Sequence, residues 1–220
     1  YATVLSRLLQ SALGLTDGQR SVLEDALMMC YDEGVPTLVE LREKVREASI
    51  SELRSPAERR EAEGLHRVLG TLMSLTGVEK LTPKAPLKFK WVTEAPTVAI
   101  LSDPKLAAVA QASLLAKALS LKAERFSVLV ELEVFENPSL LADAFRRLRE
   151  KRVGVVAVAP TLSQGGDAVK FLGNRIVHRL EDGWEMRFAE ELMGLREEES
   201  SVQSERRHRL YQREILRFLE

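Results

Sequence analysis

The chain has 220 residues, of which 45% are hydrophobic and 30% are charged, a composition typical of a globular protein. Its 32 lysines and arginines nearly balance its 33 aspartates and glutamates, which argues against a generally basic nucleic-acid-binding protein. A single cysteine, Cys30, excludes a disulfide framework, and no apolar run approaches the ~20 residues of a membrane span. We expect a cytoplasmic protein, and because Tyr1 already lies within a helical pattern, we expect the chain to be part of something longer.

The first 95 residues predict an all-helical segment. Apolar residues recur there at helical spacing, beginning with Leu5, and Cys30 lies among them as a core residue. The signals that predict where these helices begin and end are, in chain order, Gly14, Thr16 with Gln19, Gly34, Thr37 with Glu40, and Ser55 with Pro56 and Glu58.

From residue 97 the pattern changes to short apolar runs that alternate with helical stretches. The runs predict four strands, at 98–101, 126–130, 153–158 and 175–180. Asp103-Pro104 and Asn137-Pro138 predict the starts of two of the helices between them. Alternating strands and helices indicate a mainly parallel sheet, and continuous apolar strands predict burial on both faces. We therefore predict an α/β domain over residues 96–182 and a helical C-terminal extension over residues 183–220.

The chemistry of such a sheet is expected beyond the carboxyl ends of its strands. Glu131 follows the second apolar run, which is the arrangement that holds Mg²⁺ and orients water in nucleotide-hydrolysing sites. Strands also commonly end in a polar residue, so a purely structural role for Glu131 stays open. The chain contains no phosphate-binding sequence of the form GxxxxGK[ST], and its three histidines are too scattered to predict a metal site.

Two basic clusters are candidates for contact with DNA. They are Lys84, Lys88 and Lys90, which surround two aromatic residues, and Arg146, Arg147 and Arg149 at the end of a predicted helix. The alternative is that the lysines belong to a solvated connector and that the arginines complement the carboxyl end of their helix.

The order of these elements resembles the HerA/FtsK-type DNA-pumping ATPases, especially the HerA-like branch. The segments that carry the resemblance are ALGLTDGQRSVLEDAL, TVAILSDPKLAAVAQASLLAKAL, SVLVELEVFENPSLLADAFRRLREKRVGVVAVAPTLS and GNRIVHRL. The resemblance implies a RecA-like sheet, with the first 95 residues as a helical insertion ahead of the acidic strand. It also implies ATP and Mg²⁺ as cofactors wherever a phosphate-binding loop is present.

Several positions depart from the family pattern. The acidic strand of the family ends in two consecutive acids, whereas here Glu131 is followed by Leu132, with Glu133 one place later. If the strand continued, its alternation would put Glu133 on the same face as Glu131 and Leu132 on the other. Pro160 stands where the family has a glutamine that contacts the γ-phosphate. Arg175 matches a position that can offer an arginine to a neighbouring subunit, and a surface arginine is an equally good interpretation.

These departures predict a degenerate or partial HerA/FtsK-like domain that does not hydrolyse ATP by itself and binds neither a cofactor nor a metal. Its role would be structural, partner-binding or DNA-contacting, and apolar helix stripes predict self-association or pairing with a related ATPase subunit. One alternative is an active DNA-translocating ATPase whose phosphate-binding loop lies upstream of Tyr1. Another is an α/β enzyme with a small-molecule pocket over the sheet.

Overall fold

The computed structural model describes residues 1–34, 37–76, 103–121, 127–161, 166–172, 187 and 189. Almost all of them belong to one compact unit, Tyr1–Pro160 with Gln164–Leu172; a second unit comprises Thr161–Ser163 and Gly173–Glu220. The strands predicted at 98–101 and 175–180 and the domain boundaries predicted near residues 95 and 182 lie outside the described residues. So does nearly all of the predicted C-terminal extension. No helix in the described ranges is long and apolar enough to cross a membrane.

The predicted helical segment is present. It consists of α1 (Ala2–Leu13), α2 (Asp17–Glu33), α3 (Leu38–Ile50) and α4 (Pro56–Thr76). Gly14 ends α1 in the left-handed conformation, at φ 63°, where a side chain would be strained. Thr16 and Thr37 each accept a hydrogen bond from the backbone N–H three residues on, and the side chain of that residue accepts in return. The predicted helix starts and the burial of Cys30 are thus confirmed.

The next helix, α7 (Pro104–Ser120), is fixed at both ends by side chains. Asp103 caps its start, because one carboxylate oxygen accepts from the N–H of Leu106 at 3.0 Å. At the other end the Lys151 ammonium donates to the carbonyls of Leu119 and Leu121. A lysine there stabilises the helix because it satisfies carbonyls that have no intrahelical partner.

The described sheet has two parallel strands, β1 (Ser127–Glu131) and β2 (Gly154–Val158), paired so that Leu129 lies opposite Val156. The crossover between them contains three helical pieces: η1 (Leu132–Val134), η2 (Pro138–Leu141) and α8 (Ala142–Glu150). A short 3₁₀ helix, η3 (Gly166–Phe171), follows β2. The parallel pairing of these two strands is as predicted, but Asn137 precedes a 3₁₀ helix and its side chain makes no capping hydrogen bond.

Within the part of the chain that the structure describes, the two faces of this two-stranded sheet differ in burial; the predicted burial on both faces also involves strands that lie outside the described residues. On one face Val130 is completely buried. On the opposite face Leu129 is 60% exposed, Val156 52% and Val158 49%. We call this surface the open sheet face; its three apolar residues are Leu129, Val156 and Val158.

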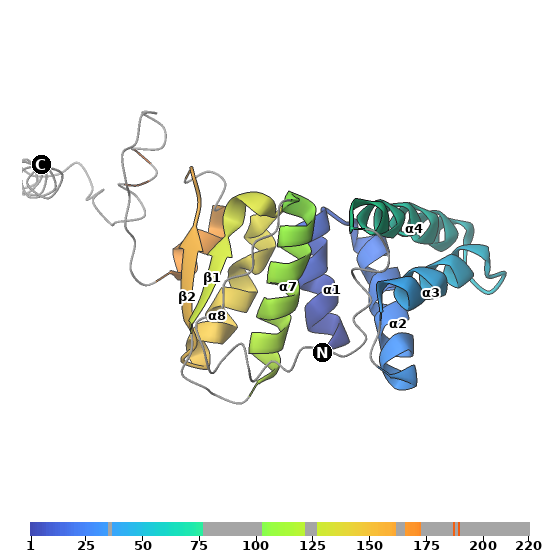
Figure 1. Ribbon diagram of the computed structural model, residues 1–220, viewed down its shortest axis with the longest axis horizontal. Helices are drawn as coiled ribbons and strands as arrows, with labels where there is room; N and C mark the ends of the chain where they lie inside the picture. Colours follow the sequence, from blue (N-terminus) through green and yellow to red (C-terminus); the bar gives the residue numbers. More distant parts are fainter. Residues whose placement is uncertain are drawn as a thin grey trace, which may run out of the picture. The chain divides into compact units, whose positions relative to one another are not determined.

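Helix α1 connects the helical segment to the α/β part. In Figure 1 it lies between α7, which backs the sheet, and α2, which leads to α3 and α4. Part of the contact with the crossover is polar and partly buried: the Ser11 hydroxyl donates to the carbonyl of Asn137 at 2.6 Å. In return the N–H of Asn137 donates to the carbonyl of Ser11 at 3.0 Å. Residues from both parts of the chain therefore form one packed unit.

Candidate functional site

Glu131 stands at the carboxyl edge of the sheet, as the sequence predicts. It is the last residue of β1, opposite Val158 of β2, and its side chain is exposed. Its backbone N–H donates to the side-chain carbonyl oxygen of Gln111 in α7 at 2.9 Å. This hydrogen bond holds the strand end against α7 and leaves the carboxylate of Glu131 accessible.

The residues after Glu131 leave the sheet at once. They form the 3₁₀ turn η1, in which the N–H of Phe135 donates to the carbonyl of Leu132 at 3.2 Å. Strand alternation therefore stops at Glu131 and does not relate Glu133 to it, unlike the arrangement expected for a continuing strand. Leu132 is 1% exposed and Glu133 is exposed. Leu132, which the resemblance to HerA/FtsK-type ATPases aligns with the second acid of that family, is thus part of the core.

Glu133 lines a hollow of about 390 Å³ at this end of the sheet. Two other acids, Asp103 and Glu136, also border the hollow, together with Lys105. The carboxylate of Asp103 is already committed to capping α7. Among the residues that the structure describes, no group of three His, Cys, Asp or Glu side chains could hold a metal ion. Glu131 does not line this hollow, so the two acids named from the sequence do not converge on one site.

The end of β2 also follows the sequence-based expectation. The strand stops at Val158, and Pro160 lies two residues further on, exposed and outside the ladder. A proline at this place cannot donate a backbone hydrogen bond, and a position beyond the strand avoids the loss of a ladder bond.

The predicted arginine cluster on α8 is divided among different contacts. Arg146 pairs with Asp143 at 2.5 Å, and Arg147 approaches the same carboxylate at 3.9 Å. Arg149 is exposed and has no ion pair with the described residues. The other predicted basic residues, Lys84, Lys88, Lys90 and Arg175, lie outside the part of the chain that the structure describes.

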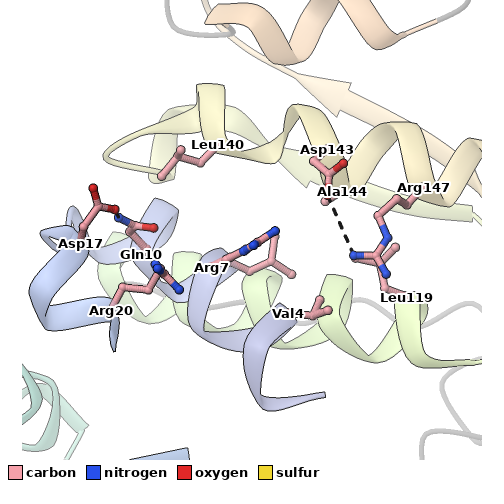
Figure 2. Close-up of a pocket in the computed structure, with 11 residues that line it drawn as sticks. Val4, Arg7, Gln10, Asp17, Arg20, Leu119, Leu140, Asp143, Ala144 and Arg147 are labelled. Atoms are coloured by element: carbon pink, nitrogen blue, oxygen red, sulfur yellow. Dashed lines mark hydrogen bonds and ion pairs between the residues drawn. The ribbon is translucent and has the colours of Figure 1, made fainter. Parts of the chain in front are cut away.

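A groove that sequence reasoning did not anticipate lies between α1, α2, α7 and the η2–α8 segment (Figure 2). Its volume is about 340 Å³, and three of its lining residues are arginines: Arg7, Arg20 and Arg147. We call it the arginine groove; its other lining residues are Val4, Leu8, Gln10, Asp17, Leu119, Leu140, Asp143 and Ala144. Each arginine comes from a different helix, so only the packing of α1 against the crossover brings them together. A polar position on the face of α1 opposite its leucines is the one sequence signal for Arg7.

The partners of the three arginines differ. Arg20 is held by Glu24 at 3.0 Å, and Glu24 also accepts from Thr3 at 2.6 Å. Arg147 has the long contact to Asp143 described above. Arg7 is exposed and has no carboxylate partner in the described ranges; Figure 2 shows its guanidinium directed into the space between α1 and the η2–α8 segment.

Comparisons with known proteins leave the chain without an assigned relative. No family model matches it, and neither the curated proteins nor the solved structures contain a significant match. The resemblance to HerA/FtsK-type ATPases therefore depends only on the order of the motifs and on their amino-acid sequences.

Proposed function

We propose that this chain is a degenerate HerA/FtsK-like domain that acts as an assembly subunit and does not hydrolyse ATP by itself. The observation that carries the proposal is the buried Leu132 directly after the strand-end Glu131. A side chain that is 1% exposed and apolar can neither orient nor activate an attacking water. Pro160, beyond β2, likewise lacks the amide that would contact a γ-phosphate. As part of this proposal, the sheet is RecA-like with four strands, and the chain ends in a helical extension.

The test of the proposal is an ATPase assay with a matched active-site variant. We expect phosphate release from Mg²⁺-ATP at the level of the buffer blank, for the wild-type chain and for Glu131→Gln alike. Phosphate release above the blank that Glu131→Gln abolishes would overturn the proposal, because it would show Glu131 at work in hydrolysis.

The open sheet face supports an assembly role and favours self-association. Parallel sheets are normally covered on both faces, and here three apolar side chains are left about half exposed or more. Neither β1 nor β2 carries a lysine or arginine, and the one charged residue of the two strands is Glu131, at the end of β1. We take a second copy of this chain as the partner; a related ATPase subunit would use the same surface.

Sedimentation equilibrium tests this partner. At high micromolar concentration we expect a dimer or larger species, and Val156→Glu should return it to 24.7 kDa without unfolding, because Val156 is half exposed. Lys117→Glu, a charge change on an exposed residue of α7, is the control. A wild-type chain that stays at 24.7 kDa, or a Val156→Glu variant that associates like the wild type, would refute the interface.

DNA contact is the less favoured role, because Arg146 and Arg147 already share Asp143. If phosphates are nonetheless bound, affinity should fall steeply with salt, and charge reversal of Arg149 should weaken it. We place the protein in the cytoplasm, where a free and buried thiol such as Cys30 stays reduced.

One observation favours a second candidate function, an active DNA-translocating ATPase. Glu131 presents an accessible carboxylate at the carboxyl edge of a parallel sheet, which is where a nucleotide-hydrolysing site would need it. This candidate requires a phosphate-binding loop encoded before Tyr1. Expression of the chain with those residues, followed by the same assay and the same Glu131→Gln variant, separates the two functions.

A further inference from the structure

The arginine groove has a surplus of positive charge that the acids around it do not neutralise. The lining has three arginines and two aspartates, Asp17 and Asp143, so the arginines exceed the acids by one. Asp17 accepts a hydrogen bond from the neutral Gln10 amide at 2.9 Å, and Glu24, which is not part of the lining, neutralises Arg20. Asp143 is taken by Arg146, which does not line the groove. This leaves the guanidiniums of Arg7, without a carboxylate partner in the described ranges, and of Arg147, 3.9 Å from Asp143.

The two guanidiniums border a wall that is apolar. Leu8, Leu119 and Ala144 are 3%, 6% and 5% exposed, so their packed side chains form a fixed surface, and Leu140, 42% exposed, forms one edge. A volume of about 340 Å³ lies within the range of pockets that bind small molecules, roughly 300–1,000 Å³. The groove thus combines planar anion-binding groups with an apolar surface.

We propose that the arginine groove binds a small organic anion, in which a carboxylate or phosphate is attached to an apolar group. Guanidinium groups bind both anions through paired N–H donors, and Arg7 can offer these donors without giving up an ion pair to any described residue. Leu8, Leu119 and Leu140 would contact the apolar part. The site lies away from the carboxyl edge of the sheet, so the inference does not depend on whether this chain hydrolyses ATP.

Isothermal titration calorimetry with four probes tests the chemistry of the ligand. Phenyl phosphate and benzoate combine an anion with an apolar ring, whereas inorganic phosphate and benzyl alcohol each carry one half of that combination. We expect phenyl phosphate or benzoate to bind with 1:1 stoichiometry and at least tenfold more tightly than either half-probe. The tighter of the two identifies the anion. If neither binds, or if inorganic phosphate binds equally well, the proposal is wrong.

A pair of variants tests the place of binding. Arg7→Gln removes the groove guanidinium that has no ion pair with the described residues, so the fold should be retained. Arg149→Gln makes the same change at an exposed α8 position outside the groove. We expect Arg7→Gln to raise the Kd of the better probe about tenfold or more, as for a lost charge-assisted hydrogen bond, and Arg149→Gln to leave it unchanged. Equal weakening by both variants, or a preference for a DNA oligonucleotide that displaces the probe, would show general electrostatic attraction and overturn the proposal.

Discussion

Two leucines three residues apart, Leu129 and Leu132, allow a direct test of the strand-end geometry. Leu132 is 1% exposed in η1, whereas Leu129 is 60% exposed on the open sheet face. Leu132→Ala should lower the free energy of unfolding by about 2–5 kcal/mol, the usual cost of a buried Leu→Ala change with its cavity. Leu129→Ala removes the same atoms from a site that is largely hydrated, so it should cost about 0.5–1 kcal/mol.

Urea unfolding followed by circular dichroism measures both variants. With a slope of roughly 2 kcal/mol/M, the midpoint of Leu132→Ala should fall by about 1–2.5 M, and that of Leu129→Ala by about 0.5 M or less. The measurement uses a low micromolar protein concentration, so that self-association through Leu129 does not contribute to the measured stability. Equal shifts would mean that Leu132 is not in the core, and the argument that it cannot serve an active site would fail with it.

Two further predictions concern α7 and α4. Lys151→Met should lower stability by about 1 kcal/mol, because the carbonyls of Leu119 and Leu121 lose their donor. Lys117→Met, in the same last turn of α7, should change the urea midpoint far less, and an equal loss would contradict the capping role. Burial, with Arg42 and Arg46 nearby, lowers the pKa of His66. As the pH falls, the His66 imidazole is therefore protonated at a higher pH in the unfolded chain than in the folded chain. Stability should therefore fall as pH drops from 7.5 to 5.5, and His66→Gln should reduce that fall; a variant with the wild-type pH profile would refute it.

Features encoded by a few neighbouring residues could be predicted from the sequence. The capping boxes at Thr16 and Thr37 and the start of α7 at Asp103 each need only residues three apart, and all three form as predicted. The position of Glu131 at a strand end follows in the same way from the apolar run before it.

Features that depend on packing could not be predicted. Continuous apolar runs in β1 and β2 predict two buried faces, but which face receives helices depends on where α7 and α8 pack. The 3₁₀ turn at Leu132 places its side chain in the core, and this packing cannot be predicted from the local sequence Glu-Leu-Glu. Arg7 and Arg147 border the same groove only after α1, α7 and α8 have packed together.

The link between Ser11 and Asn137 has a consequence for the order in which the protein is made. The two residues are 126 positions apart, and α1 also packs on α7, so α1 leaves the ribosome well before these partners. Helices α2, α3 and α4 pack on one another and can associate as soon as they emerge. Contacts between distant positions close slowly, because the loop entropy is lost before the contact forms. During synthesis α2 can cover part of α1 at once, but the side of α1 that packs on α7 and the crossover stays exposed for longer, and such transiently exposed apolar surface favours aggregation.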